Sequence, residues 1–188
     1  MHNINSLGAK SCACNGLYDA EDAVPQESDD ALLDFYVNQT CHGFPFVILA
    51  PGTTPADLEA SKPFLLQVIR MASSIRSLRS MKGQCCVILK TLSEAVYVNH
   101  QRSLDLLQGV LVLLASYHNL CALHHEFNSI VQLATSILGD LGLNRSPILP
   151  HWAKFAMREP EEPSPRTNEE RRLTAGVWYM SSKLVSYA

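Results

Sequence analysis

The densest group of metal-ligating side chains lies between residues 118 and 125, where His118, Cys121, His124 and His125 occur together. On a continuous helix, three of them would share one face, because residues three, four or seven positions apart project in similar directions. A structural zinc site needs four ligands, however, and the sequence offers no fourth for this face. Asn119 also indicates that the helix ends here. We therefore interpret the group as a polar turn and expect neither a metal nor another cofactor.

Two further groups contain reactive residue types. Cys85 and Cys86 are adjacent, but neighbouring residues of a helix project about 100° apart and rarely form a disulfide with each other. Ser103, Asp105 and His100 include the residue types of a hydrolase triad, but no Gly-x-Ser-x-Gly turn surrounds the serine. We interpret Cys85 as a small buried hydrophobe and Ser103 as a helix N-cap. The sequence therefore predicts that this protein is not an enzyme.

The segment from Ser103 to His118 is expected to lie at the centre of the fold. As a helix it carries apolar side chains nearly all round, so other elements must enclose it. Asp105 and Gln108 interrupt it, and a membrane span needs about 18 or more uninterrupted apolar residues. The predicted core of this helix and the next one comprises Leu104, Leu107, Leu111, Leu114, Leu138 and Leu141.

The rest of the chain also follows a helical pattern. Thr54 before Pro55 is typical of a helix start, as is the Thr167-x-x-Glu170 capping box, and Gly142 is typical of a helix end. An apolar repeat of 3.6 residues predicts helices over the segments 63–79, 84–98, 103–117, 124–141 and 168–186. The expected fold is an all-α, irregular bundle of about six or seven helices.

Composition divides the chain into two parts. Residues 1–27 are polar, which predicts a disordered N-terminal segment, and residues 28–188 form the expected helical domain. A loop at 144–166 contains Pro147, Pro150, Pro160, Pro163 and Pro165.

The charge pattern gives no sign of a nucleic-acid or membrane surface. The net charge of −3 provides no general attraction for nucleic acid or an anionic membrane. Some basic residues form either a patch for an acidic partner or a solvated face, and the second interpretation is favoured because no aromatic residues interleave them. These residues are Arg70, Arg76, Arg79, Lys82, Arg166, Arg171 and Arg172.

Five short segments carry a family resemblance. They are Phe44-Pro-Phe-Val-Ile48, Pro63-Phe-Leu-Leu66, Ser103-Leu-Asp-Leu-Leu-Gln-Gly109, Asp140-Leu-Gly-Leu-Asn-Arg145 and the helix from Glu169 to Ser182. In this order and spacing they resemble the helical regulatory domain, or middle homology region, of fungal binuclear zinc-cluster transcription factors. The resemblance covers roughly residues 29–188. It implies control of transcription in the nucleus through helix-mediated contacts with a protein partner.

The chain departs from that family in two ways. Members carry an N-terminal cluster of six cysteines that binds two zinc ions and reads DNA, whereas here Cys12 and Cys14 stand one residue apart with no matching pair after them. We therefore expect no specific DNA binding by this chain alone. The family's domain also continues beyond the matching final helix, so the expected domain is a truncated part of a larger one. Its candidate interaction surface comprises Trp178, Tyr179 and Tyr187.

Two functional hypotheses follow from this resemblance. The first is a regulatory and interaction module of a fungal zinc-cluster transcription factor that lacks its own DNA-binding domain. The second is a stand-alone helical protein that dimerises with a full-length regulator and dampens it, or a non-functional truncated relic. The regulatory module and the dampening protein each imply a protein partner or self-association in the nucleus, without membrane contact or covalent chemistry.

Overall fold

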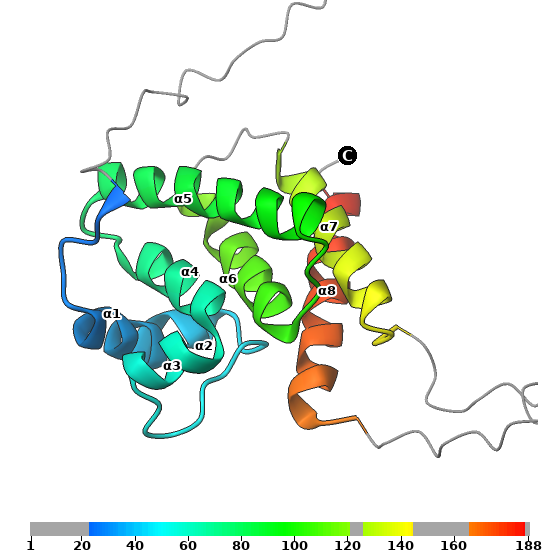
Figure 1. Ribbon diagram of the computed structural model, residues 1–188, viewed down its shortest axis with the longest axis horizontal. Helices are drawn as coiled ribbons and strands as arrows, with labels where there is room; N and C mark the ends of the chain where they lie inside the picture. Colours follow the sequence, from blue (N-terminus) through cyan, green and yellow to red (C-terminus); the bar gives the residue numbers. More distant parts are fainter. Residues whose placement is uncertain (1–22, 121–125, 145–165, 187–188) are drawn as a thin grey trace, which may run out of the picture.

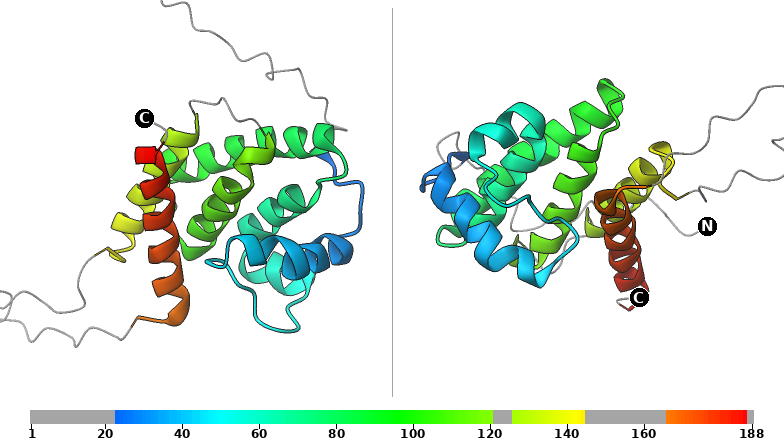
Figure 2. Two further views of the ribbon diagram at one scale, coloured as in Figure 1. Left: turned by 180° about the vertical axis from the view of Figure 1, so that it is seen from behind. Right: turned by 90° about the horizontal axis from the view of Figure 1, so that it is seen from below.

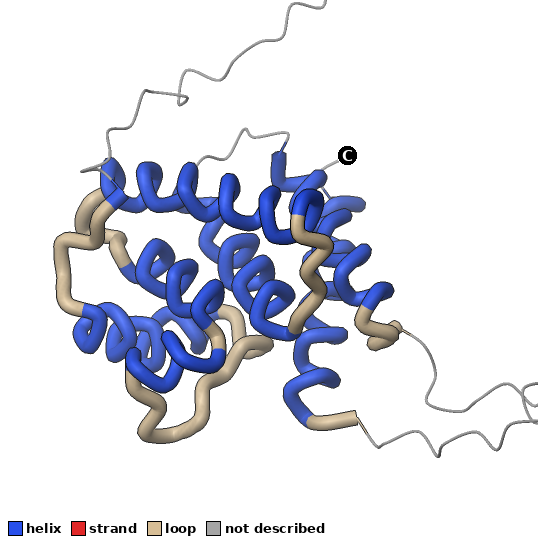
Figure 3. The backbone as a smooth tube through the Cα atoms, in the orientation of Figure 1, coloured by secondary structure: helices blue, strands red, loops and turns tan. Residues whose placement is uncertain are grey.

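The computed structural model describes residues 23–120, 126–144 and 166–186, and within these ranges the chain is helical and contains no strand (Figures 1 and 3). The prediction of an all-α fold is confirmed. The α-helices are α1 (Asp29–Phe35), α2 (Cys41–Gly43), α3 (Pro55–Ser61), α4 (Pro63–Ser73), α5 (Leu78–Ser93), α6 (Leu104–Leu120), α7 (Glu126–Asp140) and α8 (Asn168–Ser186). Two π-helical turns, η3 (Tyr36–Thr40) and η4 (Glu94–Val98), extend α1 and α5.

Helix α6 is the element around which the others pack. It contacts α4 most extensively and also contacts α5, α7 and α8. Figure 2 shows α7 and α8 side by side on one flank of the bundle, away from α1 and α3. Of the leucines predicted for the core, Leu107, Leu111, Leu114 and Leu138 are buried, and Leu104 and Leu141 are partly buried against the same cluster. None of the described helices has the length and apolar character needed to cross a membrane.

The crossing of α4 and α6 depends on a glycine. A Cβ atom added to Gly109 would lie 2.4 Å from Cδ1 of Phe64 and 3.3 Å from Cγ2 of Val68. Carbon atoms normally make contact at about 3.5–4.0 Å, so no larger residue fits between these helices as they stand. The side of α6 that carries Asp105 and Gly109 is therefore the side that faces α4.

Several helix ends follow the signals in the sequence. Thr54 and Asp57 form a reciprocal capping box with Pro55 at the first position of α3. Thr167 and Glu170 exchange the same pair of hydrogen bonds at the start of α8. At the end of α7, Gly142 has a φ of 70°, and the N–H of Leu143 donates to the carbonyl of Leu138. This is the Schellman arrangement expected from a glycine at the C′ position.

Three predicted helix boundaries are wrong. Helix α4 stops at Ser73 and α5 begins at Leu78, where the sequence indicated one helix to residue 79 and another from 84. The break has a local cause, because Ser77 caps α5 by accepting a hydrogen bond from the N–H of Ser80. Helix α6 does not break at His118 and Asn119 but continues to Leu120, whose side chain is buried.

The segment after α2, residues 44–51, contains no helix. Phe44 and Val47 are buried in it. The buried hydroxyl of Tyr36 donates a 2.8 Å hydrogen bond to the carbonyl of Val47, and burial raises the pKa of this phenol above its ordinary value. Residues 23–27 also contact the bundle, since Ser80 Oγ donates to the carbonyl of Val24. Most of the proline-containing loop lies outside the described residues.

Candidate protein-interaction surface

Helix α8 turns one face toward the bundle and leaves the other exposed. Leu173, Val177 and Met180 are buried against the core. Gly176 permits a close approach on this side, because an added Cβ would lie 2.9 Å from Cβ of Phe46 and 3.2 Å from Cδ1 of Leu111. The apolar side chains that recur every three or four residues in this helix therefore form its inner face.

Among the residues that the structure describes, the largest exposed aromatic side chain lies on the outer face of α8. Trp178 is 67% exposed, and Ala175 and Ser182, one turn before and one turn after it, are also exposed. Tyr179 is 42% exposed. We call Ala175, Trp178, Tyr179 and Ser182 the outer surface of α8. Tyr187, the third aromatic residue of the predicted interaction surface, lies outside the described residues.

Tyr179 is held in place by neighbouring side chains. Its ring centroid lies 5.5 Å from that of Phe46 and 6.2 Å from that of Phe44. The ammonium of Lys183 lies 4.9 Å from the same ring centroid, a cation–π distance. These contacts join α8 to the non-helical segment at 44–51. The tyrosine therefore belongs partly to the core and partly to the surface.

A group of polar residues fixes the start of α8. Glu169 accepts hydrogen bonds from Lys62 Nζ and from Gln108 Nε2, at 2.5 and 2.7 Å. Burial tends to raise the pKa of Glu169, but these two hydrogen bonds and the nearby charges of Lys62 and Arg172 outweigh it, so the pKa lies below its usual value. The first turn of α8 is thus tied to both α4 and α6. This tie helps to set which side of α8 faces outward.

Asp105, in the first turn of α6, fixes the start of α4. Its carboxylate accepts hydrogen bonds from the backbone N–H groups of Phe64 and Leu65, at 3.1 and 2.8 Å. These two N–H groups begin α4, whose own N-cap residue, Lys62, provides no side-chain cap. Burial raises the pKa of Asp105, and the two N–H donors offset this only in part. The cap comes from a residue 41 positions later in the chain than Phe64.

The reactive groups considered from the sequence do not come together as a catalytic site. Ser103 Oγ accepts a hydrogen bond from the N–H of Leu106, as an N-cap does, and Asp105 caps α4. His100 is exposed and has a φ of 51°. Cys85 is buried and Cys86 is exposed.

Metal ligands were also considered from the sequence. No cluster of three metal-ligating residues occurs within the ranges that the structure describes. Cys121, His124 and His125 lie outside those ranges, as does the side chain of His118.

Two of the basic residues considered for a patch pair with acidic neighbours. Arg70 binds Asp29 through two hydrogen bonds of 2.7 Å, and the charge and hydrogen bonds of this arginine hold the pKa of Asp29 below its usual value despite partial burial. Arg76 pairs with Glu27 at 3.1 Å. These pairs reduce the positive potential on this side of the molecule, in agreement with a solvated face rather than a nucleic-acid surface.

Two curated proteins are similar to this chain in sequence. Over 162 residues, or 84% of its length, the chain is 29% identical to the transcription factor himD of Aspergillus japonicus. Over 128 residues, or 66% of its length, it is 32% identical to the transcription factor opdL of Penicillium oxalicum. The matches cover 27% and 22% of these two proteins, so the chain spans about a quarter of the length of the curated relatives it matches.

No family model and no solved structure matches the chain. The two curated relatives are transcription factors and not enzymes. The two matches cover 84% and 66% of this chain. This chain is therefore related to a segment of fungal transcription factors.

Proposed function

We propose that this chain is a regulatory interaction module of the fungal zinc-cluster type, which acts in the nucleus. It binds a protein partner, or a second copy of itself, through the outer surface of α8 and catalyses no covalent reaction. The observation that carries the proposal is the similarity of most of the chain to two fungal transcription factors.

The physical support comes from Trp178. Contiguous exposed apolar patches on soluble proteins commonly mark sites where a partner binds. Tryptophan and tyrosine are also the residue types that contribute most to binding energy when they enter a partner's pocket. The small residues Ala175 and Ser182 beside Trp178 leave room for a partner element to approach it.

Rigidity of α8 adds to this support. Glu169 ties the first turn to Lys62 and Gln108, and Tyr179 packs on Phe46. A surface that is already ordered loses less conformational entropy on binding, so more of the contact energy appears as affinity. The outer surface of α8 therefore suits recognition of a partner without refolding.

A tethering experiment tests the proposal. The chain is fused to an unrelated DNA-binding domain, and a reporter gene carrying the matching DNA site is measured in fungal nuclei. We expect reporter output to differ from that of the DNA-binding domain alone, and Trp178→Ala to abolish the difference. Tyr97→Ala is the matched control, because Tyr97 is 66% exposed but lies on η4, at the end of α5. Unchanged output from the wild-type fusion, or equal losses in both variants, would contradict the proposal.

The second hypothesis is tested in the same cells. The untethered chain is co-expressed with a full-length relative that drives its own reporter. A fall in output that Trp178→Ala prevents would assign the dampening role, whereas no change would leave the chain as a module that recruits a co-regulator.

A further inference from the structure

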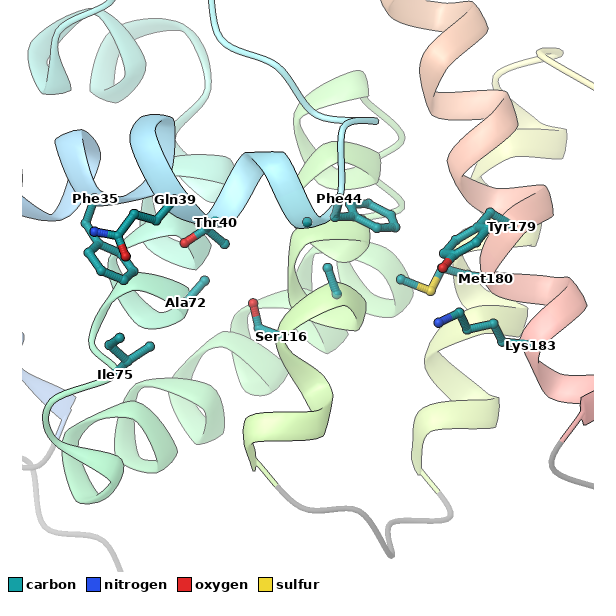
Figure 4. Close-up of a pocket in the computed structure, with 12 residues that line it drawn as sticks. Phe35, Gln39, Thr40, Phe44, Ala72, Ile75, Ser116, Tyr179, Met180 and Lys183 are labelled. Carbon is teal, nitrogen blue, oxygen red and sulfur yellow. The ribbon is translucent and has the colours of Figure 1, made fainter.

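A cavity of about 410 Å³ opens between the N-terminal helices and α8 (Figure 4). Its volume falls within the range of roughly 300–1,000 Å³ that is typical of small-molecule sites. Residues from α1, η3, α2, α4, α6 and α8 line it. The walls that these residues form are more polar than apolar, so the cavity differs from a gap in the hydrophobic core.

Ser116 brings a buried hydroxyl to this cavity. The residue lies on the central helix α6 and is only 3% exposed. Its side chain makes no hydrogen bond to any other residue that the structure describes. Figure 4 shows its oxygen pointing from α6 toward η3. Because an unpaired buried hydroxyl opposes folding, such a group usually binds water or a ligand.

Two further polar side chains border the same space. Gln39 and Thr40 are the last two residues of the π-helical turn η3, and both line the cavity. Neither side chain hydrogen-bonds to another residue within the described ranges. In Figure 4 their oxygens lie on the side of η3 that faces Ser116. A π-helical turn is rare and frequently occurs at a functional site, so these three groups are candidates for binding one ligand.

The chemistry of these three groups favours a neutral ligand that is rich in hydroxyls. A side-chain amide and a hydroxyl each donate and accept hydrogen bonds, as the hydroxyls of a ligand also do. An ionic ligand would instead exchange its hydration for contacts with neutral groups. Lys183 also lines the cavity, but its ammonium is already engaged at 4.9 Å from the centroid of the Tyr179 ring. That ring is 42% exposed and offers an apolar face to the carbon skeleton of the ligand.

We propose that this cavity binds a neutral polyol of monosaccharide size, with its hydroxyls at Gln39, Thr40 and Ser116 and its carbon skeleton against Tyr179. A ring sugar or cyclitol and an open-chain polyol share this chemistry, and the experiment distinguishes them. The assignment does not depend on the proposed function. Because Tyr179 also belongs to the outer surface of α8, a bound polyol would lie beside that surface.

Saturation-transfer NMR and isothermal titration calorimetry on the whole chain test the assignment. The polyol probes are D-glucose, D-galactose and myo-inositol, which are rings, and D-sorbitol, which is an open chain. Glucuronate is the anionic control, and cyclohexanol is a ring with a single hydroxyl. We expect at least one polyol to bind at millimolar concentration, and both controls to bind about tenfold more weakly or not at all. Preference for a ring compound identifies a sugar or cyclitol, and preference for sorbitol identifies an open-chain polyol.

Two variants and a matched control locate the site. Ser116→Ala and Thr40→Val each remove one hydroxyl with little change of shape, and each should weaken polyol binding about tenfold. Ser116→Ala should not lower the melting temperature, because its hydroxyl has no partner among the described residues to lose. Ser73→Ala is the control, since Ser73 is 2% exposed and its hydroxyl is equally unpaired in the described part of the chain, but it does not line the cavity. This control should bind polyol as wild type does.

Three results would overturn the proposal. One is that none of the four polyols binds at millimolar concentration, in which case the hydroxyls bind only water. Another is that glucuronate or cyclohexanol binds as tightly as the best polyol. The third is that Ser116→Ala binds polyol as wild type does, or that Ser73→Ala weakens binding as much as Ser116→Ala. Because these measurements use the chain alone, a negative result in the tethering experiment leaves them interpretable.

Discussion

Replacing Gly109 with alanine should have two opposing effects on the free energy of unfolding. In a helix interior, alanine is favoured over glycine by about 1 kcal/mol. The new Cβ would lie 2.4 and 2.6 Å from two ring atoms of Phe64, which is itself only 6% exposed. The ring cannot turn away into solvent, so α4 and α6 must move apart. Overpacking of this kind costs about 1–3 kcal/mol and occasionally more.

The steric effect should win because the contact is more than 1 Å shorter than a normal carbon–carbon distance of about 3.5–4.0 Å. We expect Gly109→Ala to lower the free energy of unfolding by about 2 kcal/mol. In a chain of this size that corresponds to a fall of about 4–8 °C in the melting temperature. Thermal unfolding followed by circular dichroism, with urea unfolding as a second measurement, gives both quantities.

Gly139 in α7 is the matched control. An added Cβ there would meet its nearest atom, Nδ2 of Asn144, at 3.6 Å, which is an ordinary contact. Gly139→Ala should therefore stabilise the protein by up to about 1 kcal/mol. The double variant Gly109→Ala with Phe64→Leu should recover part of the loss in a double-mutant cycle. If Gly109→Ala raised the melting temperature as Gly139→Ala does, the close crossing of α4 and α6 would be wrong.

Three further predictions concern the core, acid stability and DNA. Leu111→Ala should cost about 2–5 kcal/mol because Leu111 is 0% exposed, and a melting temperature within about one degree of wild type would show that α6 is not central. Arg70 holds the folded-state pKa of Asp29 below its usual value of 3.8, so the unfolded chain binds more protons as the pH falls through that range. The stability from this pair is therefore present above pH 3.8 and lost as the pH falls through the folded-state pKa. Asp29→Asn should flatten that part of the curve of unfolding free energy against pH. An unchanged slope would refute the assignment. The isolated chain should not shift duplex DNA selectively in a gel at physiological salt, because its net charge is −3, and selective sub-micromolar binding would contradict this.

The sequence was sufficient where local chemistry determines the structure. Apolar side chains nearly all round residues 103–118 predicted an enclosed helix, and Leu107 and Leu111 are fully buried in it. Thr54, Thr167 and Gly142 marked helix ends correctly because their hydrogen bonds join residues only three to five positions apart. Ser77 carried an equally local capping signal, and it was missed because the apolar repeat appeared continuous through residue 79.

Longer-range features could not be obtained in this way. Asp105 was recognised as a polar interruption, but its role as the cap of α4 depends on how two helices cross. The structure shows that α4 has no capping side chain of its own, because its N-cap residue is Lys62. The cavity of about 410 Å³ between the N-terminal helices and α8 likewise combines residues from six elements, α1, η3, α2, α4, α6 and α8, so no spacing in the sequence predicts it.

Sedimentation velocity at tens of micromolar tests most directly whether the outer surface of α8 binds other protein surfaces. Wild-type protein should self-associate or bind a hydrophobic dye, Tyr97→Ala should behave as wild type does, and Trp178→Ala should sediment as a monomer that binds less dye. A well-behaved wild-type monomer that binds no dye would contradict the account, because Trp178 would then be an ordinary exposed side chain.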